Sequence, residues 1–331
     1  MPAKTNAWAG KWRYVSYMAK IVVTAPQLPA ALDLLSEHQV VGGDHFMDRE
    51  ELAQNIQGAD ALLSSLSDPL DAQMIQQAGP QLKVIGQCAA GFNNIDLQAA
   101  RQANIAVTTT PGVLHEATAD LAFALLLQVT RRTGEAERLV RAGKAWRYDH
   151  TFMLGMGLQG ATLGIVGLGQ IGEAMARRGA AFGMNILYSA HSDKDTSRIG
   201  GKVRRVSNDE LIASSDVVSL HCPLTNETRH LIDADALNSM KESAYLVNTA
   251  RGACVDEKAL ASALQKGQIA GAGLDVYEDE PAISPELMRM ENVVLLPHIG
   301  SATRPTREKM SALTARNILA VLEGRQPENQ L

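Results

Sequence analysis

The stretch LGIVGLGQIG, Leu163–Gly172, decides the fold of this chain. Its first four residues are an apolar run of strand length, and an alanine-rich helical pattern, Ile171–Phe182, follows. Between them Gly167 permits a tight turn and Gly169 lets the backbone approach a pyrophosphate, while Gly172 allows the helix to pack closely on the strand. The helix N-terminus presents N–H groups to phosphates. This strand–turn–helix unit predicts a dinucleotide-binding site.

Short aliphatic runs alternate with helical patterns on both sides of this stretch, which predicts an α/β protein with parallel sheets and helices on both faces. Before the glycine turn, strands are expected at Ile21–Thr24, Ala61–Ser64, Val84–Gly86 and Ile105–Thr108, and helices at Pro29–His38, Asp71–Ala78 and Leu97–Asn104. From the turn onward, strands are expected at Thr162–Gly167, Asn185–Ser189, Val217–His221, Tyr245–Asn248, Gly273–Val276 and Val293–Pro297. Further helices are expected at Asn208–Ala213, Asp233–Asn238, Glu257–Lys266 and Arg307–Leu322. The repeated pattern predicts two doubly wound, Rossmann-like domains.

The order of these patterns predicts that one domain is inserted in the other. Residues 116–301 contain the glycine turn and form the nucleotide-binding domain. Residues 18–115 form the substrate domain, and we expect the last helix, within residues 302–331, to return to it. A boundary between two such domains is a common place for a small-molecule site.

Composition narrows the class of protein. The 331 residues are enough for two domains, and 46% hydrophobic with 20% charged residues is typical of a globular protein. A net charge of -5 argues against nucleic-acid binding, which usually needs a basic face. No apolar run is long enough to span a bilayer. The richest run, Ala117–Val129, is interrupted by Asp120 and Gln128, so we expect a buried helix there.

The number and spacing of the cysteines and the N-terminal sequence indicate the cellular compartment of the protein. Cys88, Cys222 and Cys254 are odd in number and lack metal-site spacing, so we expect reduced thiols and no metal. The chain start lacks a secretion-signal pattern, and we expect a cytoplasmic protein. Residues 1–17 differ in character from the rest, and a strand-like run begins just after Met18. We interpret residues 1–17 as an extension, or Met18 as the true start.

Arg251, Glu280 and His298 each follow the carboxyl end of a predicted strand, where parallel sheets bind ligands. His298 can exchange a proton near neutral pH. The Glu280 carboxylate would stabilise the imidazolium, and the Arg251 guanidinium can bind a carboxylate and polarise a carbonyl. Each residue alone has another interpretation. Arg251 suits a surface ion pair, Glu280 an acidic loop and His298 a structural hydrogen bond, but together they favour catalysis.

The end of the second strand of this domain, Asn185–Ser189, bears on which nicotinamide cofactor binds. NAD-binding versions carry an acidic residue there, which holds the ribose hydroxyls. Here that position is Ala190, and His191, Ser192 and Lys194 follow as donors for a 2′-phosphate. The sequence therefore favours NADP(H), with NAD(H) as the alternative because Asp193 adds an acidic charge to the loop.

An ordered set of motifs resembles the D-2-hydroxyacid dehydrogenase family from about Met18 onward, and most resembles its glyoxylate/hydroxypyruvate reductase branch. Beside the glycine turn, the motifs are Ala89–Asp96, Glu116–Asp120, His221–Thr225, Asn248–Gly252, Gly273–Val276 and Pro297–Ser301. Leu114–Ala122 and Ser301–Thr303 are in the style of that branch.

The resemblance implies a role for each matching residue. His298 would be the acid/base paired with Glu280, and Arg251 would orient the substrate. The implied substrate-binding residues also include Leu66, Ser67, Ala90 and Gly91. Implied cofactor contacts are Thr118, Gln170 and Ile171 to the pyrophosphate; Cys222, Pro223 and Thr228 on the adenosine side; and Ala250, Arg251, Asp275, His298 and Gly300 around the nicotinamide.

The resemblance also implies a homodimer, in which Arg131–Leu154 forms an arm and Trp146 or Phe152 reaches the partner. The expected activity is NAD(P)H-dependent reduction of a small 2-oxo acid, glyoxylate or hydroxypyruvate, to the D-2-hydroxy acid. One alternative is a larger substrate, such as 2-ketogluconate. Another is a non-catalytic, dinucleotide-sensing corepressor-like protein, because fold alone does not fix function.

Overall fold

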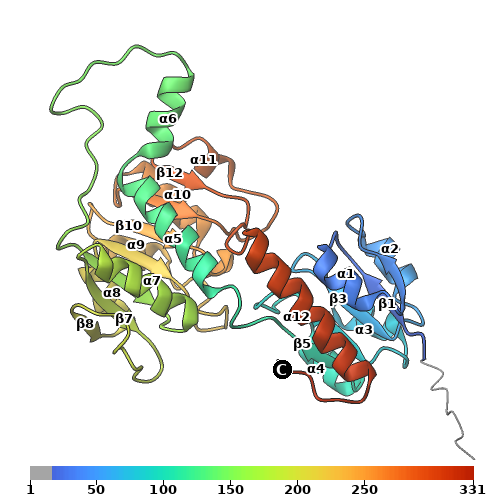
Figure 1. Cartoon of the computed structure of the whole chain (residues 1–331). Helices are drawn as coiled ribbons and strands as arrows, with labels where there is room; N and C mark the ends of the chain where they lie inside the picture. Colours follow the sequence, from blue (N-terminus) through green and yellow to red (C-terminus); the bar gives the residue numbers. More distant parts are fainter. Residues whose placement is uncertain (1–16) are drawn as a thin grey trace, which may run out of the picture. The chain divides into compact units, whose positions relative to one another are not determined.

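A computed structural model of the chain describes residues 17–331 (Figure 1). The chain forms two compact units. The smaller unit comprises the residues up to Thr109 together with Ser311–Leu331, and the larger unit comprises Thr110–Met310. The extension predicted over residues 1–17 lies outside the described residues except at Tyr17, whose hydroxyl donates to Asp60 Oδ1 at 2.8 Å.

The larger unit is built on a seven-stranded sheet in which every neighbouring pair is parallel, in the order β12-β11-β10-β9-β6-β7-β8. Its strands are β6 (Thr162–Val166), β7 (Asn185–Ser189), β8 (Val203–Arg205), β9 (Val217–Leu220), β10 (Tyr245–Asn248), β11 (Gly271–Leu274) and β12 (Val293–Leu295). The strand order reverses at β6, which lies between β7 and β9. Doubly wound sheets bind ligands beyond the carboxyl end at such a point.

The helices of this unit lie before and between these strands in the sequence. They are α5 (His115–Thr130), α6 (Thr133–Arg141), α7 (Gln170–Ala181), α8 (Asn208–Ser214), α9 (Ala234–Ser239), α10 (Glu257–Gln265) and α11 (Pro285–Met288), with a 3₁₀ turn at Gly252–Cys254. The predicted buried helix is confirmed as α5, since Ala119, Leu125 and Leu126 have no exposed surface. Gly273 lets α5 approach the sheet, because a Cβ there would lie 3.0 Å from the Leu125 Cβ.

The smaller unit has a five-stranded parallel sheet in the order β2-β1-β3-β4-β5. Its strands are β1 (Lys20–Val23), β2 (Gln39–Gly42), β3 (Ala61–Ser64), β4 (Val84–Gln87) and β5 (Ala106–Thr108). Its helices are α1 (Pro29–Leu35), α2 (Arg49–Asn55), α3 (Ala72–Ala78) and α4 (Leu97–Gln102), and the long helix α12 (Arg304–Leu322) contributes Ala315 and Ile318 to its core. The prediction of two α/β units with parallel sheets is confirmed.

The sequence-based expectation missed the edge strands β2 and β8, the helices α2, α6 and α11, and the 3₁₀ turn at Gly252–Cys254. Strand β8 contains the exposed Arg204 and Arg205, so it has no apolar run to reveal it. Helix α2 buries only Leu52, which leaves little hydrophobic periodicity. The last helix begins at Arg304 rather than at the expected Arg307. Pro305 lies in its first turn, where a proline is compatible with the start of a helix.

Candidate active site

The glycine turn follows β6 and opens α7, as predicted. Gly167 has a φ of +91°, and a Cβ there would lie 2.8 Å from the Cys222 backbone nitrogen. A Cβ on Gly172 would lie 2.2 Å from the Gly167 carbonyl oxygen, so only glycine permits this packing. Gly169, the N-cap of α7, has no atom near the position of a Cβ and no side chain capping the helix. The turn thus leaves space and N–H donors at the helix N-terminus, which fits a pyrophosphate.

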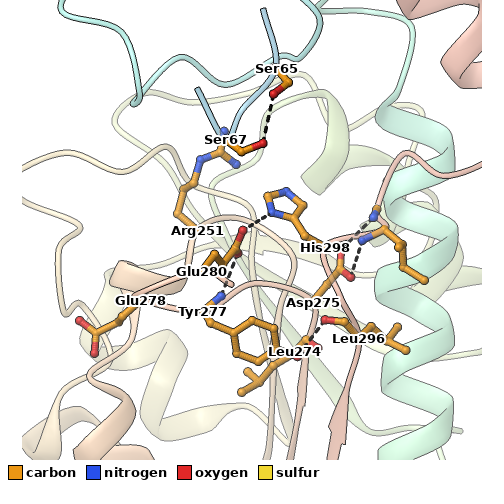
Figure 2. Close-up of polar contacts among 12 residues, drawn as sticks. Ser65, Ser67, Arg251, Leu274, Asp275, Tyr277, Glu278, Glu280, Leu296 and His298 are labelled. Atoms are coloured by element: carbon orange, nitrogen blue, oxygen red, sulfur yellow. Dashed lines mark hydrogen bonds and ion pairs between the residues drawn. The ribbon is translucent and has the colours of Figure 1, made fainter. Parts of the chain in front are cut away.

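His298 and Glu280 point toward one another beyond the carboxyl ends of β12 and β11 (Figure 2). Their Nδ1 and Oε2 atoms are 2.7 Å apart. The second oxygen of Glu280 accepts the Tyr277 N–H at 3.0 Å. Burial acts to raise the pKa of Glu280, but the hydrogen bond and charge of His298 oppose it with help from Arg251, and the net shift is downward. Glu280 is therefore a carboxylate at neutral pH.

Asp275 fixes the backbone beside the histidine. Its two carboxyl oxygens accept the N–H groups of Ile299 and Gly300, each at 2.8 Å (Figure 2). Asp275 is buried, and this burial raises its pKa against the opposing effect of the two N–H donors and of His298. His298 itself has a φ of +53°, in the left-handed region that few residues other than glycine adopt. The hydrogen bonds of Asp275 to Ile299 and Gly300 hold the backbone directly after His298.

Tyr277 connects the Glu280 loop to the segment that carries His298. Its backbone N–H binds Glu280, and its hydroxyl donates to the Leu296 carbonyl oxygen at 2.8 Å. Burial raises the pKa of Tyr277 strongly, with the charge of Asp275 acting in the same direction. The phenol therefore stays protonated and remains a donor.

Arg251 follows β10 and is partly buried. The neighbouring Asn248 shapes the turn, because its side chain accepts the Ala250 N–H at 3.0 Å and donates to the Arg251 carbonyl at 2.9 Å. Burial lowers the pKa of the Arg251 guanidinium, and the charge of Glu280 opposes this shift. An arginine remains charged even so, and it provides the cation in this part of the site.

The loops around the glycine turn hold the other residues expected at the cofactor. The Thr228 hydroxyl donates to the Pro223 carbonyl at 2.6 Å and shapes the loop after the buried Cys222. Thr118 is also buried, and its side chain lies 3.2 Å from where a Gly300 Cβ would be. Thr118 of α5, Asp275 and Gly300 therefore lie close together.

The loop after β7 contains exposed donors, and Arg205 of the neighbouring strand β8 contacts this loop. His191, Ser192 and Lys194 are exposed. Arg205 of β8 donates to the Ala190 carbonyl at 2.8 Å and pairs with Asp193 at 2.8 Å. Its position follows from β8 pairing with β7, which sets Arg205 opposite Tyr188. No signal could have placed it, because β8 itself was not predicted.

The expected substrate residues of the smaller unit lie in two adjacent loops. Leu66 and Ser67 follow β3, and Ala90 and Gly91 follow β4, its parallel neighbour. Ser67 is exposed, whereas the other three are partly exposed.

A buried network ties these two loops together. Gln87 accepts from the Ser64 hydroxyl at 2.7 Å and donates to Asn94 at 2.8 Å. Asn94 in turn donates to the carbonyls of Ser65 and Asp68. The sequence-based reasoning missed this positioning role of Gln87, although a buried polar residue at a strand end needs a partner.

Comparisons with known proteins agree with the fold. Residues 123–300 match the NAD binding domain of D-isomer specific 2-hydroxyacid dehydrogenases. The chain is 48% identical over 286 residues to a glyoxylate reductase of Thermococcus litoralis, covering 85% of this chain and 86% of that one. It is 44% identical over 321 residues to a glyoxylate reductase of Aeropyrum pernix, covering 94% and 95%.

A solved structure adds a cofactor complex. The NADPH-dependent glyoxylate/hydroxypyruvate reductase of Sinorhizobium meliloti, in complex with NADP and malonate, matches with a TM-score of 0.83 at 32% identity, covering 95% of this chain and 96% of that one. The chain belongs to the D-isomer specific 2-hydroxyacid dehydrogenase family, which confirms the resemblance seen in its motifs. It is an oxidoreductase that uses a nicotinamide dinucleotide.

Residues 17–331 contain neither a helix that could span a membrane nor a cluster of metal-ligating side chains. No helix described there is both long and apolar enough to cross a membrane. The same residues contain no group of three or more His, Cys, Asp or Glu side chains that could hold a metal ion.

Proposed function

We propose that the protein reduces glyoxylate and close relatives such as hydroxypyruvate to the D-2-hydroxy acid, with NADPH as the preferred reductant. The observation that carries the proposal is the 2.7 Å contact of His298 with Glu280 in a chain 48% identical to a glyoxylate reductase. An imidazole held by a carboxylate is suited to protonate the oxygen of a carbonyl that accepts a hydride.

The cofactor, when bound, supplies the hydride. Gly167, Gly169 and the N-terminus of α7 would hold its pyrophosphate, with Thr118 nearby. The Asp275 side chain and the Ala250 carbonyl would hold the nicotinamide carboxamide.

The remaining steps belong to the side chains. Glu280 receives a hydrogen bond from the Nδ1 side of His298, so Nε2 is the nitrogen that would give its proton to the substrate oxygen. Arg251 would bind the substrate carboxylate and polarise the carbonyl, since a guanidinium forms paired hydrogen bonds with a carboxylate. We also propose substrate contacts for Leu66, Ser67, Ala90 and Gly91, as the family resemblance implies. Together these groups supply the binding and the proton that the reduction needs.

Preference for NADPH is supported by the loop after β7. Ala190 carries no charge to repel a 2′-phosphate, and His191, Ser192 and Lys194 are exposed donors. Arg205 adds a guanidinium at the Ala190 carbonyl and pairs with Asp193, whose charge would otherwise oppose the phosphate.

The proposal extends to assembly and compartment. We propose a cytoplasmic homodimer in which the segment Arg131–Leu154 packs against the second subunit. This segment exposes several large apolar side chains, with Val140 at 64%, Trp146 at 58% and Leu154 at 64% exposed. Sedimentation of the purified protein tests this assembly, because an isolated monomer would contradict the proposed arm.

A substrate panel tests the activity. Oxidation of NADPH and of NADH is followed by absorbance with glyoxylate, hydroxypyruvate, pyruvate and 2-ketogluconate. We expect the highest kcat/KM with glyoxylate or hydroxypyruvate and NADPH. A higher value with 2-ketogluconate would assign a larger substrate, and no turnover with any 2-oxo acid would contradict the proposed function.

A further inference from the structure

A second imidazole–carboxylate pair lies in the larger unit, apart from the His298 pair. His230 Nε2 is 2.6 Å from Glu278 Oε1. The other oxygen of Glu278 accepts the backbone N–H of Glu257 at 3.2 Å, at the start of α10. The Glu257 side chain returns the contact by accepting the Glu278 N–H at 2.6 Å. Glu278 is therefore bound by two elements besides its own loop.

His230 is itself firmly placed. Its backbone has a φ of +49°, and its N–H donates to the Ala253 carbonyl at 2.8 Å. The left-handed conformation of a histidine is costly, so the surrounding contacts must hold it. Ala253 lies in the 3₁₀ turn directly after Arg251, which links His230 to the segment that carries the guanidinium.

Glu278 is two residues from Glu280, in the loop Tyr277–Glu280. Tyr277 binds Glu280 through its N–H and the Leu296 carbonyl through its hydroxyl. The loop also packs closely against Gly252, because a Cβ on Gly252 would lie 1.8 Å from the Tyr277 carbonyl carbon. A displacement of Glu278 would therefore move Glu280 relative to both His298 and Arg251.

Three acidic side chains gather around this contact. Burial raises the pKa of Glu257, and the charges of Glu278 and Asp279 act in the same direction. His230 supplies the donor that binds Glu278 among these like charges. The groups that face Glu280 are different: His298, Arg251 and Asp275. Loss of His230 would leave Glu278 repelled by its neighbours without changing any charge that faces Glu280 directly.

We infer that His230 and Glu278 are positioning residues, which hold the Tyr277–Glu280 loop so that Glu280 meets His298 in the reactive geometry. This inference rests on the proposed roles of Glu280 and His298 in 2-oxo acid reduction. Neither His230 nor Glu278 touches the substrate in this account. They act on the rate through the placement of Glu280.

The test compares His230→Ala and Glu278→Gln with wild type, with His230→Gln as the conservative variant that keeps a donor. His45→Ala is the matched control, because His45 also pairs with a glutamate, Glu51, at 2.7 Å but lies in the smaller unit. Glyoxylate reduction is measured from about pH 6 to about pH 9, the range over which a histidine acid changes state. Coenzyme binding is measured by fluorescence titration.

We expect His230→Ala and Glu278→Gln to lower kcat about tenfold with little change in KM or coenzyme affinity, since small displacements of catalytic groups cost about 10- to 100-fold. The alkaline fall of the rate should move to lower pH, because a displaced Glu280 stabilises the imidazolium less. His230→Gln should recover most of kcat, and His45→Ala should match wild type.

Two results would overturn the inference. One is a wild-type kcat and pH profile in His230→Ala and Glu278→Gln. The other is a lowered kcat with an unshifted pH profile that His230→Gln does not recover, which indicates general loss of structure. Failure of the proposed function is distinguishable, because it would appear as a His298→Ala variant as active as wild type, or as no turnover in wild type.

Discussion

Glu280 binds His298 through one carboxyl oxygen and the Tyr277 N–H through the other, so the carboxylate that faces the imidazole is fixed on both sides. A carboxylate held in this way keeps the ring oriented and lies beside the positive charge that the ring carries when it is protonated. The pKa of Glu280 is shifted downward in spite of its burial, because the hydrogen bond and the charge of His298 act on the carboxylate.

Glu280→Gln should therefore change the pH dependence of reduction. The glutamine keeps the shape but loses the charge, so the imidazolium is less stable and the rate should fall at a lower pH than in wild type. We expect the loss in kcat/KM to be larger at about pH 8 than at about pH 6. Steady-state assays at both values check this, and an equal loss at both would argue against a charge effect.

Asp275→Asn should weaken the backbone beside His298. Only one oxygen remains to accept an N–H, so either Ile299 or Gly300 loses its acceptor. Loss of a hydrogen bond to a charged group costs about 1.5–3 kcal/mol, and we expect a comparable drop in the free energy of unfolding together with a lower kcat. Denaturant unfolding measures the first effect. Asp120→Asn, at an exposed ion pair with Arg178, should change stability by less than about 1 kcal/mol.

Arg205→Ala should reduce the preference for NADPH. Removal of the guanidinium at the Ala190 carbonyl would take away a proposed ligand of the 2′-phosphate and leave the Asp193 charge unpaired. We expect kcat/KM to fall about tenfold with NADPH and by much less with NADH, the scale of one charge-assisted hydrogen bond. Arg204→Ala is the control, since Arg204 pairs with Glu210 and successive strand residues point to opposite faces. Equal losses with both cofactors in Arg205→Ala would remove this arginine from phosphate recognition.

His221 should make the protein sensitive to acid. Burial lowers its pKa to about 3, and its Nε2 lies 2.8 Å from the Ser219 hydroxyl. The folded pKa is below the unfolded value, so between about pH 6.5 and about pH 3 only the unfolded chain binds the extra proton. Stability therefore falls as the pH is lowered through this range, by up to about 1.4 kcal/mol per pH unit.

The variant His221→Gln separates this contribution from other acid effects. Its free energy of unfolding should depend less steeply on pH than that of wild type, even if its stability at neutral pH is lower. Denaturant titrations at several pH values supply the two slopes. Identical slopes would mean that His221 is protonated equally in the folded and unfolded chains.

The fold was largely predictable because apolar strands and the glycine turn are local features of the sequence. The central strands of both sheets are short aliphatic runs, and α5 has an apolar core face. The edge strand β8 was not predictable, because Val203–Arg205 is held by pairing with β7 rather than by its own hydrophobic pattern. Arg205 was missed for the same reason.

The candidate site was predictable only as a set of residue types. His298, Glu280 and Arg251 could be found because each follows a strand whose carboxyl end faces ligands in such sheets. The contacts that position them depend on tertiary structure. Neither the hydrogen bonds of Asp275 to the backbone nor the pairing of His230 with Glu278 leaves a spacing signal in the sequence.

The most direct test of the central claim is the turnover of glyoxylate by His298→Ala, measured with saturating NADPH beside a fluorescence titration of the coenzyme. If His298 is the acid held by Glu280, kcat should fall by about 10²-fold or more while coenzyme affinity stays within about twofold of wild type. A kcat near that of wild type would contradict the account, because the proton would then come from another group.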